Sequence, residues 1–146
     1  MRKERRMIMN TKTYTTLPQE AKDIRIEVFV KEQGFENEFD EIDTISHHIV
    51  AFDERKPIGT CRFFKENDHY TIGRVAVLKE YRNQHMGSLL LESAENEIKK
   101  LNGDLIVVHA QVRIHPFYEK QGYIQFGQID DDEGVPHMWM KKKIQY

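Results

Sequence analysis

The residues best suited to chemistry lie in segment 75–88, where a run of apolar residues leads through a short polar turn into a helical pattern. A strand that enters a helix in this way presents unpaired backbone N–H groups and the positive end of the helix dipole, which favour a bound phosphate. Arg82 adds a forked cationic donor, Gly87 lets the backbone approach the anion, and Ser88 offers a hydroxyl. The segment predicts an anion-binding turn, although a simple capped helix start is the alternative.

Apolar periodicity predicts the elements that position this turn. Helical spacing indicates helices over 18–32, 86–101 and 114–121, and Thr16 and Gln19 have the spacing of a capping box for the first of them. Strands are predicted before the first helix and over 48–52, 57–64, 70–78, 105–110, 123–128 and 135–141. Short connections make most strands antiparallel, whereas a crossover helix makes 70–78 and 105–110 a parallel pair. The expected fold class is α+β (mixed α/β), with a mainly antiparallel central sheet and flanking helices.

Composition limits the classes of protein to consider. The chain has 146 residues, 39% of them hydrophobic and 32% charged, which suits one folded domain. We expect this domain to span 11–146, residues 1–10 to form a flexible basic leader, and 141–143 to be a solvated tail. A formal net charge of -2 disfavours nucleic acid as a partner. Apolar runs are far below the roughly 18 residues of a membrane helix, and no secretory signal is present, so we expect no membrane partner and a cytoplasmic location.

Three features of the sequence suggest a metal site or a cysteine nucleophile but lack the residue spacing or surroundings that such a site needs. The acidic residues 130–133 lack the alternating spacing of a calcium loop, and we interpret them as a solvated turn. His47 and His48 have no partner at ligand spacing, so no metal is expected. Cys61 lies within a predicted strand without the surroundings of a nucleophile, which disfavours a covalent acyl-cysteine route.

Around the predicted turn, the sequence resembles the GCN5-related N-acetyltransferases (GNAT superfamily). The signature of that family is Arg or Gln, two residues, Gly, one residue, and Gly or Ala, placed just after a strand. Here the six places run from Arg82 to Gly87, and Val77 stands where the strand valine of the family stands. His85 replaces the first signature glycine. A second motif, FYEKQGY at 117–123, is similar to the helix-to-strand segment of the family.

Three further segments narrow the resemblance to the ElaA/YjcF-like branch of the superfamily. They are EVFVKEQGF at 27–35, HAQ at 109–111 and GVPHMWM at 134–140. The similarity covers nearly all of residues 10–142. Proteins of this branch are usually assigned only a general acetyltransferase activity.

The resemblance implies that acetyl-CoA is the cosubstrate and lies between parallel strands that splay apart. Such strands leave backbone N–H and C=O groups that need a partner, and the pantetheine arm would bond them near Val75, Ala76 and Val77. The pyrophosphate would rest on the turn, with Phe117 beside it; the turn consists of Arg82, Asn83, Gln84, His85, Met86, Gly87 and Ser88. Tyr118 would be the general acid that protonates the departing thiolate, a packing role being the alternative.

The general base remains open at this stage. A free alkylamine with a pKa of about 10.4 is protonated near neutral pH and must lose a proton before it attacks. His109 and His137 are candidate bases, while Glu32, Asp43 and His47 could line the acceptor side. A chain of water molecules could equally relay the proton. The acidic stretch 36–43 further suggests a preference for a cationic amine.

The sequence thus predicts an N-acetyltransferase that transfers an acetyl group from acetyl-CoA to a primary amine of a small molecule or peptide. The amine would attack directly in a ternary complex. A non-catalytic acyl-CoA-binding or sensing module on the same fold is the alternative, and release of free CoA distinguishes the two. Many relatives are dimers, so the resemblance also allows a homodimer.

Overall fold

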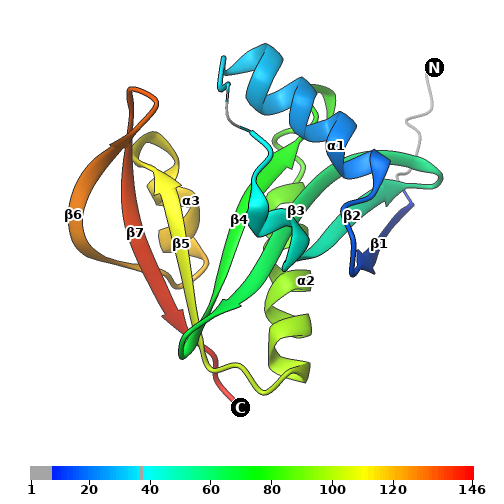
Figure 1. The fold of residues 1–146 in the computed structure, drawn as a ribbon. Coiled ribbons are helices and arrows are strands. Elements are labelled where there is room, and N and C mark those ends of the chain that lie inside the picture. Colours follow the sequence, from blue (N-terminus) through cyan, green and yellow to red (C-terminus); the bar gives the residue numbers. More distant parts are fainter. Residues whose placement is uncertain (1–7, 37) are drawn as a thin grey trace, which may run out of the picture.

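A computed structural model describes residues 8–36 and 38–146, which form a seven-stranded sheet flanked by helices (Figure 1). The strands are β1 (Met9–Tyr14), β2 (His47–Asp53), β3 (Lys56–Glu66), β4 (His69–Val77), β5 (Leu105–Gln111), β6 (Ile124–Asp132) and β7 (Val135–Lys143). The α-helices are α1 (Gln19–Arg25), α2 (Met86–Lys100) and α3 (His115–Lys120). The other helical elements are the π-helix η1 (Ile26–Glu32) and the 3₁₀ turns η2 (Glu41–Thr44), η3 (Lys79–Tyr81) and η4 (Val112–Ile114).

The sheet has the strand order β1-β2-β3-β4-β5-β7-β6. Neighbouring strands are antiparallel except for β4 and β5, which are parallel. Helix α2 is the crossover between these two strands, as the spacing of the sequence predicts. The predicted fold class is therefore confirmed.

Both faces of the sheet centre are covered because alternate residues of its strands are apolar on both sides. In β2, Ile49 and Ala51 belong to the core cluster that contains the buried face of α2, while Val50 and Phe52 pack with α1. Figure 1 shows α1 in front of the sheet and α2 behind it. This packing holds the ends of β4 and β5, where the candidate site lies. Within the described ranges, no helix is long and apolar enough to cross a membrane.

The first helix occupies the predicted residues but is built differently. The predicted capping box is wrong: Pro18 occupies the N-cap, and no side chain caps the helix. Proline already removes one of the N–H groups that a cap would satisfy. After Arg25 the helix continues as the π-helix η1 and ends at Glu32, two residues before Gly34, whose φ is 77°. π-helical turns are rare and frequently lie at functional sites.

Three predictions about polar segments need correction. Met9 and Asn10, assigned to the leader, lie in the edge strand β1, while residues 1–7 lie outside the described part of the chain. The predicted tail 141–143 belongs to β7, where it pairs with β5. The acidic segment is also mostly strand, since β6 extends to Asp132 and the turn begins at Glu133. In each case backbone pairing outweighs side-chain polarity, because the outward face of a strand accepts charged residues.

Candidate active site

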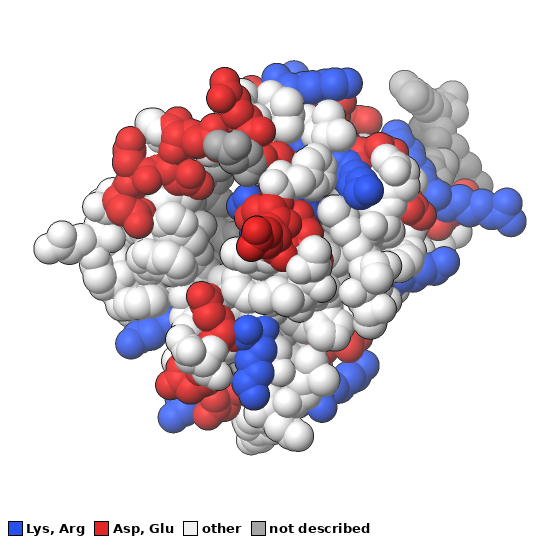
Figure 2. Space-filling view, viewed as in Figure 1, with Lys and Arg blue, Asp and Glu red and all other residues white. Residues whose placement is uncertain are grey.

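The parallel strands β4 and β5 pair over only three residues each. Residues 70–72 pair with 106–108, and beyond this point the two strands diverge (Figure 1). The predicted splayed pair is thus confirmed. The opening leads into a cavity of about 1250 Å³, bounded by both strands, η1, the start of α2, and α3. Figure 2 shows the hollow between the β6–β7 side of the molecule and its centre.

The inner edge of β4 offers backbone groups to this cavity. Ala76 and Val77 pair with β3 on their outer side, but beyond Ile72 no residue of β4 pairs with β5. Val75, Ala76 and Val77 all line the cavity, as the resemblance implies. Because buried backbone N–H and C=O groups need partners, this edge can bind an extended ligand with amide groups.

The turn between β4 and α2 has an unusual backbone. Asn83 and His85 both adopt the left-handed region, with φ of 63°, and His85 is the N-cap of α2. His85 stands where the family signature has glycine, the residue that adopts this conformation most easily. The N–H groups of the first helical turn remain without intrahelical acceptors and can bind an anion. Of the seven predicted residues, only Gln84 does not line the cavity; its amide donates to the carbonyl of Glu80.

Replacing His85 by glycine tests the role of this conformation. The change removes the cost of holding a non-glycine residue in the left-handed conformation, which stabilises the fold by roughly 1–2 kcal/mol. It also raises the conformational entropy of the unfolded chain, which destabilises the fold by about 0.4–1 kcal/mol. We therefore expect His85→Gly to leave the free energy of unfolding unchanged or to raise it by up to about 1.6 kcal/mol in urea titrations. His85→Ala is the control that removes the imidazole and keeps the strain. A tenfold loss of acetyl-CoA affinity in both variants would show instead that the imidazole itself contributes to binding.

Arg82 is held in place by two elements. Its Nε donates to the carbonyl of Val77 at 3.0 Å, and its two terminal nitrogens donate to the carboxylate of Glu32 at 2.8 and 2.9 Å. The hydrogen bond from Arg82 lowers the pKa of Glu32. Glu32, expected on the acceptor side, is absent from the lining of the main cavity and borders a smaller hollow of about 280 Å³. It therefore connects the end of η1 to the turn between β4 and α2.

Gly87 lies in the first turn of α2, opposite Phe117. A Cβ atom at Gly87 would lie 3.2 Å from Cζ of the Phe117 ring. Gly87 lines the cavity, and the prediction that its backbone approaches an anion stays a prediction. The missing side chain leaves room for Phe117, which itself lines the cavity.

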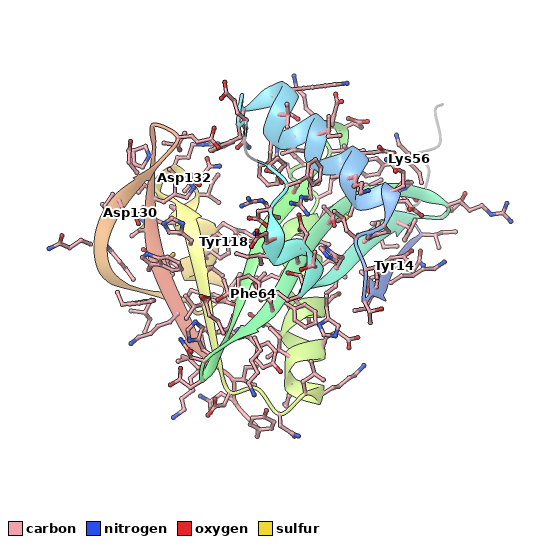
Figure 3. The ribbon with its side chains drawn as sticks, viewed as in Figure 1. Tyr14, Lys56, Phe64, Tyr118, Asp130 and Asp132 are labelled. Carbon is pink, nitrogen blue, oxygen red and sulfur yellow. The ribbon has the colours of Figure 1, made fainter. Side chains whose placement is uncertain are left out.

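Tyr118 projects from α3 toward the cavity (Figure 3). Its ring packs edge-on against Phe117 and Tyr123, with centroids 5.0 and 5.8 Å apart. Burial raises its pKa above the ordinary value, so the hydroxyl stays protonated at neutral pH. The hydroxyl makes no hydrogen bond to residues 8–36 or 38–146, and it remains available as a donor to a ligand. Cys61 lies nearby, and burial raises its pKa to about 12, which suppresses the nucleophilic thiolate.

The two candidate histidines lie together on the opposite face of the sheet. His109 of β5 stacks on Trp139 at 4.2 Å and lies 4.7 Å from His137, both on β7. All three rings line the cavity. Asp130 of β6 accepts a hydrogen bond of 2.7 Å from His109. The sequence argument missed Asp130 because nothing in its spacing indicates that a distant histidine lies beside it.

Two acidic residues of the stretch 36–43, Glu38 and Asp40, line the cavity, but arginines neutralise their carboxylates. Glu38 and Asp43 are buried, and both bond the guanidinium of Arg25 at 2.7 and 2.8 Å. Arg62 bonds Asp43 and Asp40, and Arg74 bonds Glu38 and Asp40. Three arginines thus balance three carboxylates, so this stretch does not support a preference for a cationic amine. Asp43, predicted on the acceptor side, is absent from the cavity lining.

Acid unfolding tests this buried network. Two arginines lower the pKa of Asp43 to about 2 from 3.8. Its contribution to stability is therefore complete above pH 3.8 and is lost as the pH falls toward 2. At 1.36 kcal/mol per pKa unit, this contribution is about 2 kcal/mol. We expect the free energy of unfolding of Asp43→Asn to fall less between pH 5 and pH 2 than that of the wild type, and equal slopes would contradict the assignment.

The remaining predicted residue, His47, lies away from the cavity. Its ring stacks on Phe63 at 4.8 Å, and it does not line the hollow. Two residues that sequence reasoning missed, Gln33 and Gln111, form a hydrogen bond of 2.9 Å between η1 and β5 over the cleft. Among the described residues, no cluster of three or more His, Cys, Asp or Glu could hold a metal ion.

Comparison with known proteins agrees with this geometry. The family of acetyltransferase (GNAT) domains matches residues 14–144. The chain is 34% identical to YjcF of Bacillus subtilis, named an uncharacterised N-acetyltransferase, across 82% of this chain and 87% of YjcF. A Lactobacillus plantarum protein assigned as an N-acetyltransferase has a crystal structure with a TM-score of 0.87 at 28% identity, covering 94% of this chain and 99% of that one. Escherichia coli ElaA has a TM-score of 0.82 at 22% identity, with 92% and 99% coverage.

The splayed strands, the turn at the start of α2 and the family match together define the class: the chain belongs to the GNAT acetyltransferases. This class carries out acyl-CoA-dependent N-acetylation. Within it, the similarity to YjcF and ElaA places the chain in the ElaA/YjcF-like branch.

Proposed function

We propose that the protein transfers the acetyl group of acetyl-CoA to a primary amine of a small molecule or peptide. The observation that carries this proposal is the position of the Tyr118 hydroxyl, which is protonated and makes no hydrogen bond within the described ranges, in a cavity bordered by the free edge of β4. An extended thioester arm along that edge would lie within the same cavity as Tyr118. The hydroxyl is then the proton donor for the leaving thiolate.

The cofactor would be held mainly by backbone groups. The amides of the pantetheine arm would bond the edge at Val75 and Val77, and the pyrophosphate would rest on the N–H groups at the start of α2. Phe117 and Gly87 shape the wall beside it. Arg82 supplies positive charge at this end, although its fork is shared with Glu32.

The reaction would be a direct displacement through a tetrahedral intermediate. The amine attacks after its ammonium proton has been released to solvent. Its lone pair forms the C–N bond while a base takes a second proton from the nitrogen, and the C–S bond breaks as sulfur takes the proton of Tyr118. His109 and His137 lie on the face of the sheet opposite Tyr118, where an amine can enter without displacing the cofactor. This arrangement supports a ternary complex.

Ligand stabilisation and CoA release test the proposal together. Acetyl-CoA at about 100 times its Kd is expected to add roughly 2.7 kcal/mol to the free energy of unfolding, whereas adenosine or acetate alone should not. Release of free CoA thiol is then measured with spermidine, an aminoglycoside and a lysine peptide. A thermal melt unchanged by saturating acetyl-CoA would overturn the proposal. Stabilisation without any CoA release would indicate the acyl-CoA-sensing alternative.

A further inference from the structure

An aromatic stack lines the front of the cleft. The register pairs His109 with Trp139 and Gln111 with His137 across β5 and β7, which puts these side chains on one face of the sheet. Tyr118 belongs to the core cluster on the other face, together with Val108 and Ala110. A ligand in the gap would therefore have the tyrosine on one side and the histidines on the other.

Hydrogen bonds fix the tautomers of both neutral histidines. The carboxylate of Asp130 only accepts, so the 2.7 Å contact places a proton on Nε2 of His109 and leaves its Nδ1 lone pair free. The carbonyl of Val135 likewise accepts from Nδ1 of His137 at 2.8 Å. Each ring therefore keeps one nitrogen able to accept a proton.

An irregularity in β6 gives Asp130 its position. Between the pairs Phe126–Trp139 and Asp130–His137, β6 advances four residues while β7 advances two. Gly127 lies within this bulge with φ of 72°, a conformation that favours glycine. Bulges re-aim side chains near active sites. Here the bulge brings an otherwise exposed carboxylate against His109.

We propose that Asp130 is a positioning residue that orients His109 as the general base of the acetyl transfer. This inference rests on the proposed function. The charged or titratable side chains recorded against the His109 ring are Asp130 from β6 and His137 from β7. The His109 ring bonds the Asp130 carboxylate, whereas the recorded partner of the His137 ring is the backbone carbonyl of Val135, so we assign the base role to His109. His137 then serves as a stacking partner.

The proton balance assigns each group one task. The acceptor reacts as the neutral amine, having released its ammonium proton to solvent. As the C–N bond forms, the N–H proton passes to Nδ1 of His109, and the resulting imidazolium keeps its Nε2–H bond to Asp130. The amine lone pair forms the C–N bond, the C–S bond breaks, and the sulfur takes the proton of Tyr118. Transfer of the proton from His109 through solvent to the tyrosinate restores both groups. Figure 3 shows Tyr118 on the β4 side of β5 and Asp130 on the β6 side, as this division requires.

Hydrolysis of acetyl-CoA provides a probe that needs no knowledge of the natural acceptor. Water in the acceptor position must lose a proton just as an amine must, and the products are acetate and free CoA. We expect Asp130→Asn to lower this rate about tenfold or more, as loss of an oriented base should. The Kd of acetyl-CoA should stay the same. Asp131→Asn, the same change at the neighbouring exposed residue, is the matched control and should have no effect.

Two further measurements separate positioning from a structural role. In a His109→Gln background, Asp130→Asn should cause no additional loss, because Asp130 acts only through His109. Imidazole ¹⁵N NMR should show the Nε2–H tautomer of His109 in the wild type and a mixture of tautomers in Asp130→Asn. Additive losses, or an Nδ1–H tautomer in the wild type, would overturn the inference. An inactive wild type with the Nε2–H tautomer intact would overturn the proposed function instead.

Discussion

Replacing Tyr118 by phenylalanine is expected to lower the rate of acetyl transfer by at least about 10²-fold, the usual range for loss of a general acid. The ring packs against Phe117 and Tyr123, and phenylalanine keeps these contacts. The hydroxyl makes no hydrogen bond within the described residues, so its removal leaves no buried group unpaired. We therefore expect acetyl-CoA affinity and the free energy of unfolding to stay close to wild type. Single-turnover CoA release measures the chemical step directly.

Tyr123→Phe is the matched control for this substitution. Tyr123 is also buried and packs on Tyr118, but its hydroxyl donates to the carboxylate of Glu95 at 2.8 Å. Removing this hydroxyl should reduce the free energy of unfolding by about 1.5–3 kcal/mol, the range for a hydrogen bond to a charged group. It should leave the single-turnover rate nearly unchanged. Equal rates for wild type and Tyr118→Phe, with chemistry shown to be slow, would assign Tyr118 to packing.

Local patterns were sufficient to predict the elements and their parallel pair. The apolar residues of α2 recur at helical spacing, and the flanking strands are too short and too apolar to be anything else. A helix that connects two strands of one sheet returns the chain to the same end of the sheet. The two strands, β4 and β5, are therefore parallel. The splay between them and the role of Tyr118 came from the family resemblance, since no periodicity indicates where two strands separate.

Contacts between distant residues escaped the sequence argument. Glu38 and Asp43 look like solvated carboxylates until Arg25 and Arg62, from a helix and a strand, surround them. Asp130 looks like part of a turn until the β6 bulge brings it to His109. The sequence gives the charge of each of these carboxylates, but it does not show which oppositely charged side chain lies beside it in the fold. Charge runs are therefore weak indicators of pocket electrostatics in this fold.

The backbone winding of the N-terminal helix also depends on contacts that the sequence pattern does not show. The predicted helix 18–32 is present, but its second half is π-helical. This winding accompanies two hydrogen bonds, one that Arg82 donates to Glu32 and one that Gln111 donates to Gln33. These contacts join the helix to both sides of the cleft. Propensity alone does not distinguish α from π winding, because the choice depends on tertiary contacts.

Gly87→Leu is expected to weaken acetyl-CoA binding by at least 10²-fold, which corresponds to about 2.7 kcal/mol. A Cβ at Gly87 already meets the Phe117 ring at 3.2 Å, and the longer leucine side chain must displace that ring. Phe117 is half-buried and lines the cavity, so it can move only by narrowing the space beside the pyrophosphate turn. Leucine is a good helix former, and the helix itself should persist. Calorimetric titration with acetyl-CoA measures the loss.

The smaller substitution Gly87→Ala separates crowding from backbone effects. Its single methyl group requires the Phe117 ring to shift by only a few tenths of an ångström, so affinity should fall by less than about tenfold. In the double variant Gly87→Leu with Phe117→Ala, the leucine has room, and part of the affinity should return. Circular dichroism and thermal melts confirm that each variant is folded. Wild-type affinity in folded Gly87→Leu would show that the phosphates bind away from the start of α2. If the double variant binds acetyl-CoA as weakly as Gly87→Leu, the loss of affinity does not arise from displacement of the Phe117 ring.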